Sequence, residues 1–304
     1  MKAWVAHEQG IAALGTIPDD VTIEVYGGTG DYPSDPATVR FWTPPFLSTS
    51  RATAPLADLT GLQVLQLLTA GADVWAPVVP DGVTLCNAKG AHTAATAEWA
   101  LTATLASLRG FNHFALAQDR AEWAPRVTES LADKKVLIIG AGDIGSAIAR
   151  RVEASDGIVT MVGTRARDGV RGVDELPELL PPADVVILIV PLTEATNGMV
   201  DREFLAAMKD GALLVNAARG PVVDTDALVA ELDGGRLRAA LDVTDPEPLP
   251  SDHPLWRSPN LLITPHVGGA VEGMVSKVYE VVGEQLRRFA AGEPLQNIVR
   301  GKGY

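Results

Sequence analysis

The chain has little of the chemistry on which several classes of protein depend. Its 304 residues include one cysteine, Cys86, which excludes an intramolecular disulfide and a thiolate metal cluster. Positive charge is scarce: 25 basic against 38 acidic residues give a net charge of −13, which argues against nucleic acid and anionic membranes as partners. No uncharged apolar run is long enough to span a bilayer, and residues 1–8 lack the apolar run of a signal peptide. We therefore expect a cytoplasmic protein without a metal site.

What the sequence does have is an alternation of apolar, β-branched runs with helical patterns, which is typical of parallel sheets with crossover helices. In the first third, strands are expected at residues 3–6, 22–25, 38–41, 64–68 and 83–86. A helical pattern over about residues 93–118 precedes a second series, expected at residues 136–139, 159–162, 185–190, 212–215, 239–242 and 261–264. A last helical pattern covers residues 271–289.

Six strands in the second series match a doubly wound, dinucleotide-binding sheet. The fold class that we predict is α/β with two doubly wound domains. A Rossmann dinucleotide-binding domain would cover residues 96–286. A smaller, flavodoxin-like substrate domain would consist of residues 1–95 and be completed by residues 287–304.

A glycine-rich turn follows the first strand of the second series. Residues 136–139 run into Gly140-Ala141-Gly142-Asp143-Ile144-Gly145, and a helical pattern follows. In a dinucleotide-binding fingerprint the first glycine permits the tight turn, the second lets the backbone approach the pyrophosphate, and the third allows helix and strand to pack closely. The helix N-terminus offers free amides to the phosphates. We predict a dinucleotide site here; the alternative is a tight turn without a ligand.

The end of the next strand bears on the choice of cofactor. An NAD site usually has an Asp or Glu about 20 residues further on that binds the ribose. Here Gly163-Thr164-Arg165-Ala166-Arg167 follows the strand, and no carboxylate stands before Asp168. A hydroxyl and two guanidinium groups suit a 2′-phosphate. NADP(H) is therefore favoured, and NAD(H) is the alternative if the two arginines only face solvent.

Three polar residues follow later apolar runs, namely Arg219, Glu247 and His266. Each would emerge at the carboxyl end of a strand, the edge where open α/β sheets bind ligands. A cation, a carboxylate and a histidine supply an anion clamp and a proton donor. Singly they could be a strand cap, a turn carboxylate and a core histidine; their joint placement favours a catalytic site.

These motifs together resemble the D-2-hydroxyacid dehydrogenase family, which includes glyoxylate/hydroxypyruvate reductases and phosphoglycerate dehydrogenases. The resemblance covers nearly the whole chain, through residues 69–73, 97–101, 140–145, 191–193, 216–220, 241–248 and 264–266. It implies an oxidoreductase acting on CH–OH donors, which reduces a 2-oxo acid to a D-2-hydroxy acid by hydride transfer from NAD(P)H.

The resemblance also implies a role for each residue. His266 would give the proton, Glu247 would orient its ring and stabilise the imidazolium, and Arg219 would hold the substrate carboxylate. Ala70 and Gly71 would bind the substrate through their amides, together with Arg219 and His266. The expected cofactor-binding residues are Gly140, Gly142, Asp143, Ile144, Gly145, Thr164, Arg165, Arg167, Pro191, Thr193, Thr196, Ala217 and Asp242.

The identity of the substrate is poorly encoded. The arginines of the ribose turn resemble those of NADPH-using glyoxylate/hydroxypyruvate reductases, so small 2-oxo acids are expected. Residues 42–46 could wall the pocket, although core packing explains the aromatic residues equally well. Arg51, nearby in sequence, could meet a second anionic group of the substrate. A homodimer is expected, in which Trp123 would either reach the partner's site or pack within its own chain. The alternative function is a dinucleotide-sensing, corepressor-like or regulatory binding module.

Overall fold

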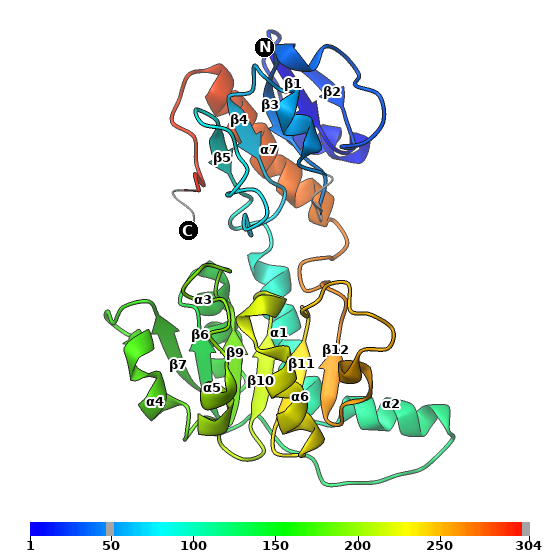
Figure 1. Ribbon diagram of the computed structural model, residues 1–304, viewed down its shortest axis with the longest axis vertical. Coiled ribbons are helices and arrows are strands. Elements are labelled where there is room, and N and C mark those ends of the chain that lie inside the picture. The colour runs from blue at the N-terminus through cyan, green and yellow to red at the C-terminus, as the bar shows by residue number, and fades with distance from the viewer. Residues whose placement is uncertain (47–51, 300–304) are drawn as a thin grey trace. The chain divides into compact units, whose positions relative to one another are not determined.

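The computed structural model describes residues 1–46 and 52–299, and the chain divides into two compact units (Figure 1). The first unit is Met1–His92 with Val271–Tyr304, and the second is Thr93–Ala270. The second boundary thus falls at residue 271, where the sequence suggested 287. The reason is helix α7 (Met274–Ala290), which packs against the 3-10 helix Glu8–Leu14. A Cβ on Gly283 would come within 2.0 Å of the Leu14 carbonyl oxygen, so glycine permits this close contact.

The first unit contains a five-stranded parallel sheet in the order β2-β1-β3-β4-β5, which is the flavodoxin-like order. Its strands are β1 (Lys2–Val5), β2 (Thr22–Val25), β3 (Val39–Thr43), β4 (Val64–Gln66) and β5 (Thr84–Cys86). Both faces are buried, since the successive residues Phe41 and Trp42, whose side chains point to opposite faces, lie in different core clusters. All five expected strands are confirmed, with ends shifted by one or two residues.

The end of the described chain returns to β5 of the same unit. Ile298 forms an antiparallel bridge with Cys86, and the Val299 amide donates to the Leu85 carbonyl oxygen at 2.9 Å. Gln285 of α7 secures this segment, because its Oε1 accepts from the Gln296 amide at 2.9 Å. These bonds explain why the C-terminal segment completes the first unit.

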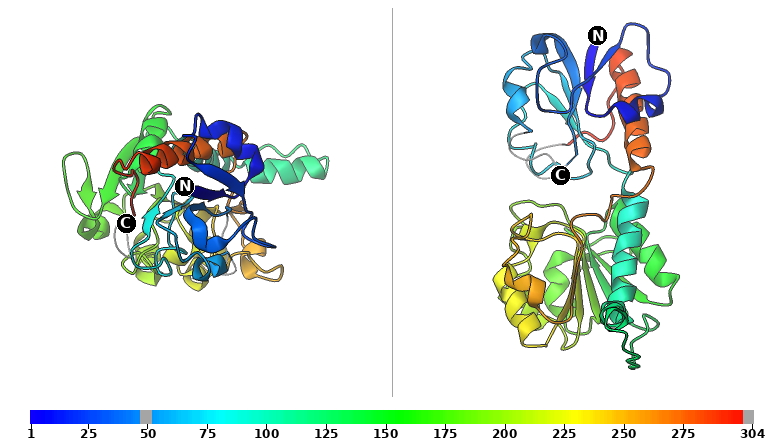
Figure 2. Two further views of the ribbon diagram at one scale, coloured as in Figure 1. Left: turned by 90° about the horizontal axis from the view of Figure 1, so that it is seen from above. Right: turned by 90° about the vertical axis from the view of Figure 1, so that its right-hand side faces the viewer.

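The second unit contains a seven-stranded parallel sheet in the order β12-β11-β10-β9-β6-β7-β8. The strands are β6 (Lys135–Ile139), β7 (Ile158–Gly163), β8 (Arg171–Gly172), β9 (Val185–Leu188), β10 (Leu213–Asn216), β11 (Arg238–Leu241) and β12 (Leu261–Ile263). Helices cover both faces (Figure 2). They are α1 (Thr93–Leu108) and α3 (Asp143–Glu153) on one face, and α4 (Leu176–Leu179), α5 (Arg202–Ala207) and α6 (Thr225–Asp233) on the other. The six expected strands are confirmed; β8 is too short to have shown a pattern.

The helical pattern after the first sheet forms two helices rather than the single helix expected over residues 93–118. Helix α1 ends at Leu108, and α2 (Phe111–Asp119) begins after Gly110, whose backbone is left-handed with φ 63°. Glycine adopts this conformation without steric cost, so it ends the helix that the apolar spacing alone would continue. Among the described residues, no helix has the length and apolar character needed to cross a membrane.

Candidate active site

Arg219, Glu247 and His266 lie in loops that follow three adjacent strands. Arg219 comes after β10, Glu247 after β11 and His266 after β12, and these strands pair in parallel in the order β10-β11-β12. The register aligns the last residue of β10 with the last of β11, so their loops leave the same edge. The topology therefore brings all three residues to the carboxyl edge of the sheet.

His266 and Glu247 form a direct hydrogen bond. The imidazole Nδ1 lies 2.6 Å from Glu247 Oε1, and the side chains are 30% and 38% exposed. An ionised carboxylate only accepts hydrogen bonds, so Nδ1 carries the hydrogen of this contact. The other ring nitrogen, Nε2, is then the atom through which His266 can exchange a proton with a bound molecule.

The pKa of Glu247 lies below its ordinary value. Burial raises it, but the hydrogen bond and charge of His266 lower it, as do a backbone hydrogen bond from Thr244 and the charge of Arg219. The net effect keeps the Glu247 carboxylate ionised at neutral pH. The site thus holds a fixed negative charge against the ring of His266.

The loop that carries Arg219 is fixed by a buried side chain. Asn216 is almost fully buried; its Nδ2 donates to the Arg219 carbonyl at 3.0 Å, and its Oδ1 accepts from the Ala218 amide at 2.9 Å. The Arg219 guanidinium donates through Nη1 to the Ala218 carbonyl at 2.8 Å. A Cβ on Gly220 would lie 1.9 Å from the Thr244 carbonyl oxygen, so the loops after β10 and β11 are in close contact there.

Asp242 directly follows β11 and is 5% exposed. The family resemblance implies that it binds the cofactor, and this contact stays a prediction. In the chain itself, the Asp242 carboxylate accepts hydrogen bonds from the loop that carries His266.

The glycine-rich turn has the geometry of a dinucleotide cradle. Gly140 has φ +122°, and a Cβ there would lie 2.3 Å from the Ile189 carbonyl oxygen. A Cβ on Gly145 would meet the Gly140 carbonyl oxygen at 1.9 Å. Gly142, which precedes α3, is different: a Cβ there would meet no atom within 4 Å. The fold itself therefore does not require glycine at 142, whereas the close approach of a phosphate would. The turn fits a dinucleotide on this ground.

The residues that follow β7 lie beside this turn. The Arg167 guanidinium donates from Nη2 to the Ala141 carbonyl at 2.8 Å, and its backbone exchanges two hydrogen bonds of 2.9 Å with Val170. Thr164, Arg165 and Arg167 are all exposed. The side chain of Arg167 thus contacts the glycine-rich turn and is not directed only into solvent.

The remaining cofactor candidates also lie at this edge. After β9, the Thr196 hydroxyl donates to the Pro191 carbonyl at 2.6 Å, and it accepts from the Thr193 amide at 2.8 Å. Ala217 follows β10, and its amide bonds the Leu188 carbonyl at the end of β9. The sequence-predicted cofactor residues of the second unit therefore lie at the carboxyl ends of β6, β7, β9, β10 and β11.

In the first unit, Ala70 and Gly71 lie in a turn after β4. Their carbonyl oxygens accept from Asn87 Nδ2 at 2.8 Å and from the Thr69 hydroxyl at 2.7 Å. Within the described ranges, no acceptor pairs with their amides. Of the expected pocket wall, residues 42 and 43 are fully buried in the core and Phe46 is partly buried; Arg51 lies outside the described residues.

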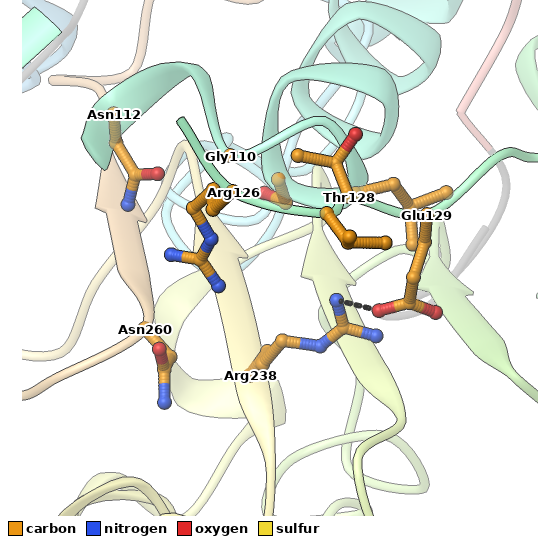
Figure 3. A pocket seen from close by; sticks show the side chains of 10 residues that line it. Gly110, Asn112, Arg126, Thr128, Glu129, Arg238 and Asn260 are labelled. Atoms are coloured by element: carbon orange, nitrogen blue, oxygen red, sulfur yellow. Dashed lines mark hydrogen bonds and ion pairs between the residues drawn. The ribbon is translucent and has the colours of Figure 1, made fainter. Parts of the chain in front are cut away.

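A polar pocket lies at the opposite edge of the second sheet (Figure 3). Arg238 begins β11 and Asn260 immediately precedes β12, so both mark the amino ends of their strands. Arg238 pairs with Glu129 at 2.7 Å (Figure 3). No residue predicted to bind substrate or cofactor lines this pocket.

Trp123 belongs to the segment between α2 and β6. It is 97% exposed, and Val127 in the same segment is 96% exposed. The alternative that Trp123 packs within its own chain is therefore wrong.

Comparison with known proteins identifies the family to which the chain belongs. The model of the D-isomer specific 2-hydroxyacid dehydrogenase NAD binding domain matches residues 101–268, more than half of the chain. The chain therefore belongs to the D-isomer-specific 2-hydroxyacid dehydrogenase family, and the matched part is its NAD-binding domain.

Similar proteins extend this match. The glyoxylate/hydroxypyruvate reductase A of Salmonella typhi is 33% identical over 215 residues, which cover 68% of each chain. A D-3-phosphoglycerate dehydrogenase of Methanocaldococcus jannaschii is 34% identical over 229 residues, 72% of this chain and 43% of that protein. A D-isomer specific 2-hydroxyacid dehydrogenase from Xanthobacter autotrophicus Py2, solved with NADPH and MES, aligns over 98% of both chains with 29% identity and a TM-score of 0.84. The matches span about half the length of the first curated relatives.

Proposed function

We propose that this chain is an NADPH-preferring reductase that converts a small 2-oxo acid into the D-2-hydroxy acid. The observation that carries the proposal is the 2.6 Å contact between His266 and Glu247, in a site where Arg219 supplies a cation from the neighbouring strand end. A proton donor, a carboxylate that holds it and an anion-binding cation are what reduction of a 2-oxo acid needs.

Each side chain has a separate part in the reaction. Arg219 binds the substrate carboxylate and polarises the carbonyl. The reduced nicotinamide cofactor, when bound, supplies the hydride that adds to the carbonyl carbon. His266, protonated on both nitrogens, passes the Nε2 proton to the carbonyl oxygen, which becomes the hydroxyl group. Glu247 remains ionised and stabilises the imidazolium before this transfer.

The preference for NADPH is supported by the turn after β7. A 2′-phosphate there would meet the exposed Thr164, Arg165 and Arg167, and the turn holds no carboxylate before Asp168. Arg167 is already held next to the phosphate-binding turn through Ala141. The relative from Xanthobacter autotrophicus was solved with NADPH, which agrees with this proposal.

A cytoplasmic homodimer is part of the proposal. Trp123 and Val127 are almost completely exposed, and such side chains are unfavourable in water unless a partner covers them. The molar mass in solution tests this: a mass near 64 kDa, twice the 32.0 kDa of the chain, supports the dimer, and a mass of one chain contradicts it.

The experiment that tests the activity is NADPH oxidation with glyoxylate, hydroxypyruvate, pyruvate and phenylpyruvate as separate substrates. We expect turnover with the smaller acids, since the Salmonella relative is named for glyoxylate and hydroxypyruvate. Tight cofactor binding without oxidation in the presence of any 2-oxo acid would contradict the proposal and favour a regulatory binding module.

A further inference from the structure

Asp242 accepts hydrogen bonds from the part of the loop that carries His266. Asp242 Oδ1 accepts from the Val267 amide at 2.9 Å, and Oδ2 accepts from the Gly268 amide at 2.7 Å. The backbone carbonyl of Asp242 accepts from the His266 amide at 2.7 Å. Three consecutive amides, those of residues 266 to 268, are thus held by one residue at the end of β11.

The backbone of His266 needs such support. Its φ is +54°, in the left-handed region that residues with a Cβ rarely adopt. A conformation of this kind persists only where the surroundings hold it. The fit is tight at Gly268, where a Cβ would lie 2.8 Å from Asp242 Oδ2 and 3.4 Å from the Trp99 ring.

Two further side chains fix the carboxylate. The Thr264 hydroxyl donates to Asp242 Oδ1 at 2.6 Å, and Trp99 Nε1 lies 3.0 Å from the same hydroxyl oxygen. A hydroxyl has one hydrogen and an indole N–H only donates, so the two bonds have a fixed direction, from Trp99 to Thr264 to Asp242. Trp99 is on α1 and packs against the core cluster on that face of the sheet. The series therefore links a packed helix to the His266 loop.

We propose that Trp99, Thr264 and Asp242 are positioning residues, which hold His266 in the conformation that places its Nδ1 against Glu247. The inference rests on the proposed function, in which His266 gives the proton. Misplacement of a reacting group by about 1 Å can cost about 100-fold in rate, so a network that acts on the backbone of His266 can control turnover without touching the substrate.

The test compares two substitutions at one position. Thr264→Val keeps the shape of the side chain and removes the hydroxyl, whereas Thr264→Ser keeps the hydroxyl. We expect kcat to fall on the order of 10- to 100-fold in Thr264→Val, with little change in the Kd for NADPH, and to stay within about 3-fold of wild type in Thr264→Ser. Thr104→Val is the matched control, because the Thr104 hydroxyl is buried but donates within α1 to Ala100. It should leave kcat unchanged.

Trp99→Phe tests whether Trp99 acts on Asp242 through its hydrogen bond to Thr264. It removes the indole N–H and keeps an aromatic ring, so we expect a smaller loss of kcat than in Thr264→Val. The double variant should be no slower than Thr264→Val alone, because Trp99 acts through Thr264. If the losses of kcat in the two single variants add up in the double variant, Trp99 does not act through Thr264.

A second measurement does not depend on activity. In protein with ¹⁵N-labelled histidine, the Nδ1 proton of His266 gives a signal that is assigned by its loss in His266→Ala. We expect this signal in wild type, Thr264→Ser and Thr104→Val, and its loss or broadening in Thr264→Val. An unchanged signal together with unchanged kcat in Thr264→Val would overturn the inference. If wild type oxidises no NADPH with any 2-oxo acid, the proposed function fails, and the ring-proton signal alone decides whether the network positions His266.

Discussion

The imidazole of His266 and the carboxylate of Glu247 are 2.6 Å apart, although the residues are separated by 19 positions and lie in different loops. The loops meet because β11 and β12 are neighbours in the sheet. The contact has an electrostatic consequence, since it contributes to the low pKa of Glu247 and fixes which ring nitrogen of His266 carries the bonded hydrogen. Replacement of either residue should therefore have a different effect on activity.

Replacement of His266 by alanine should lower kcat strongly and leave the cofactor in place. Loss of a general acid typically costs about 10² to 10⁴ in rate, and we expect a fall in kcat within this range. The Kd for NADPH, measured by fluorescence titration, should change little, because the predicted phosphate and ribose contacts lie after β6 and β7. His113→Ala serves as control for the loss of a histidine; turnover preserved in His266→Ala would refute the assignment.

Replacement of Glu247 by glutamine should change the pH dependence of kcat/KM. Reduction needs the protonated imidazole, and histidine side chains lose that proton near neutral pH, so kcat/KM should fall as the pH rises. Glutamine has no fixed negative charge to hold against the ring, so the profile of Glu247→Gln should differ from that of wild type by a lower kcat/KM on the acidic side. Profiles measured between about pH 5 and 10 check this, and identical profiles in both proteins would exclude the role of Glu247.

The low pKa of Glu247 also predicts an effect on stability. A carboxylate whose pKa is lower in the folded than in the unfolded chain stabilises the fold above its ordinary pKa, and this contribution is lost as the pH falls through the folded value. Urea unfolding of wild type should therefore weaken more steeply with acidification than that of Glu247→Gln. Parallel pH dependences would show that the pair contributes nothing to stability.

Two glycines of the phosphate-binding turn should respond differently to alanine. Gly145→Ala places a Cβ 1.9 Å from the Gly140 carbonyl oxygen, so it should lower the Tm or prevent folding. Gly142→Ala meets no protein atom within 4 Å and should leave the Tm near that of wild type, while it weakens NADPH binding by obstructing the phosphate. Thermal unfolding and cofactor titration distinguish the two effects; unchanged NADPH affinity in Gly142→Ala would place the phosphate elsewhere.

The strands and the three residues Arg219, Glu247 and His266 could be predicted from the sequence for one physical reason. A parallel strand buried on both faces is a continuous apolar run, so its end is visible where the first polar residues appear. Arg219, Glu247 and His266 stand after three such runs, and the order of strands in a doubly wound sheet then places them together. The glycine fingerprint was visible in the same way, between a strand and a helix.

What the sequence did not reveal depends on contacts between distant residues. Helix α7 belongs to the first unit because Gly283 contacts Leu14, and no local pattern links these two positions. The bonds from Trp99 to Thr264 and on to Asp242 join three separate elements, so spacing could not indicate them. The sequence does not predict the break at Gly110, because a single glycine is tolerated within a helical pattern and only its left-handed backbone ends the helix.

Arg167 should determine the preference for NADPH over NADH. Wild type should show a higher kcat/KM with NADPH than with NADH. A charge-assisted hydrogen bond contributes about 1.5–3 kcal/mol, so Arg167→Ala should lower kcat/KM with NADPH by about 10- to 100-fold. The value with NADH should change far less, and only through the lost bond to Ala141. Arg202→Ala removes the same charge from another exposed position of the second unit and should preserve the preference. If wild type prefers NADH, or if Arg202→Ala has the same effect as Arg167→Ala, then the 2′-phosphate is not recognised by the turn after β7.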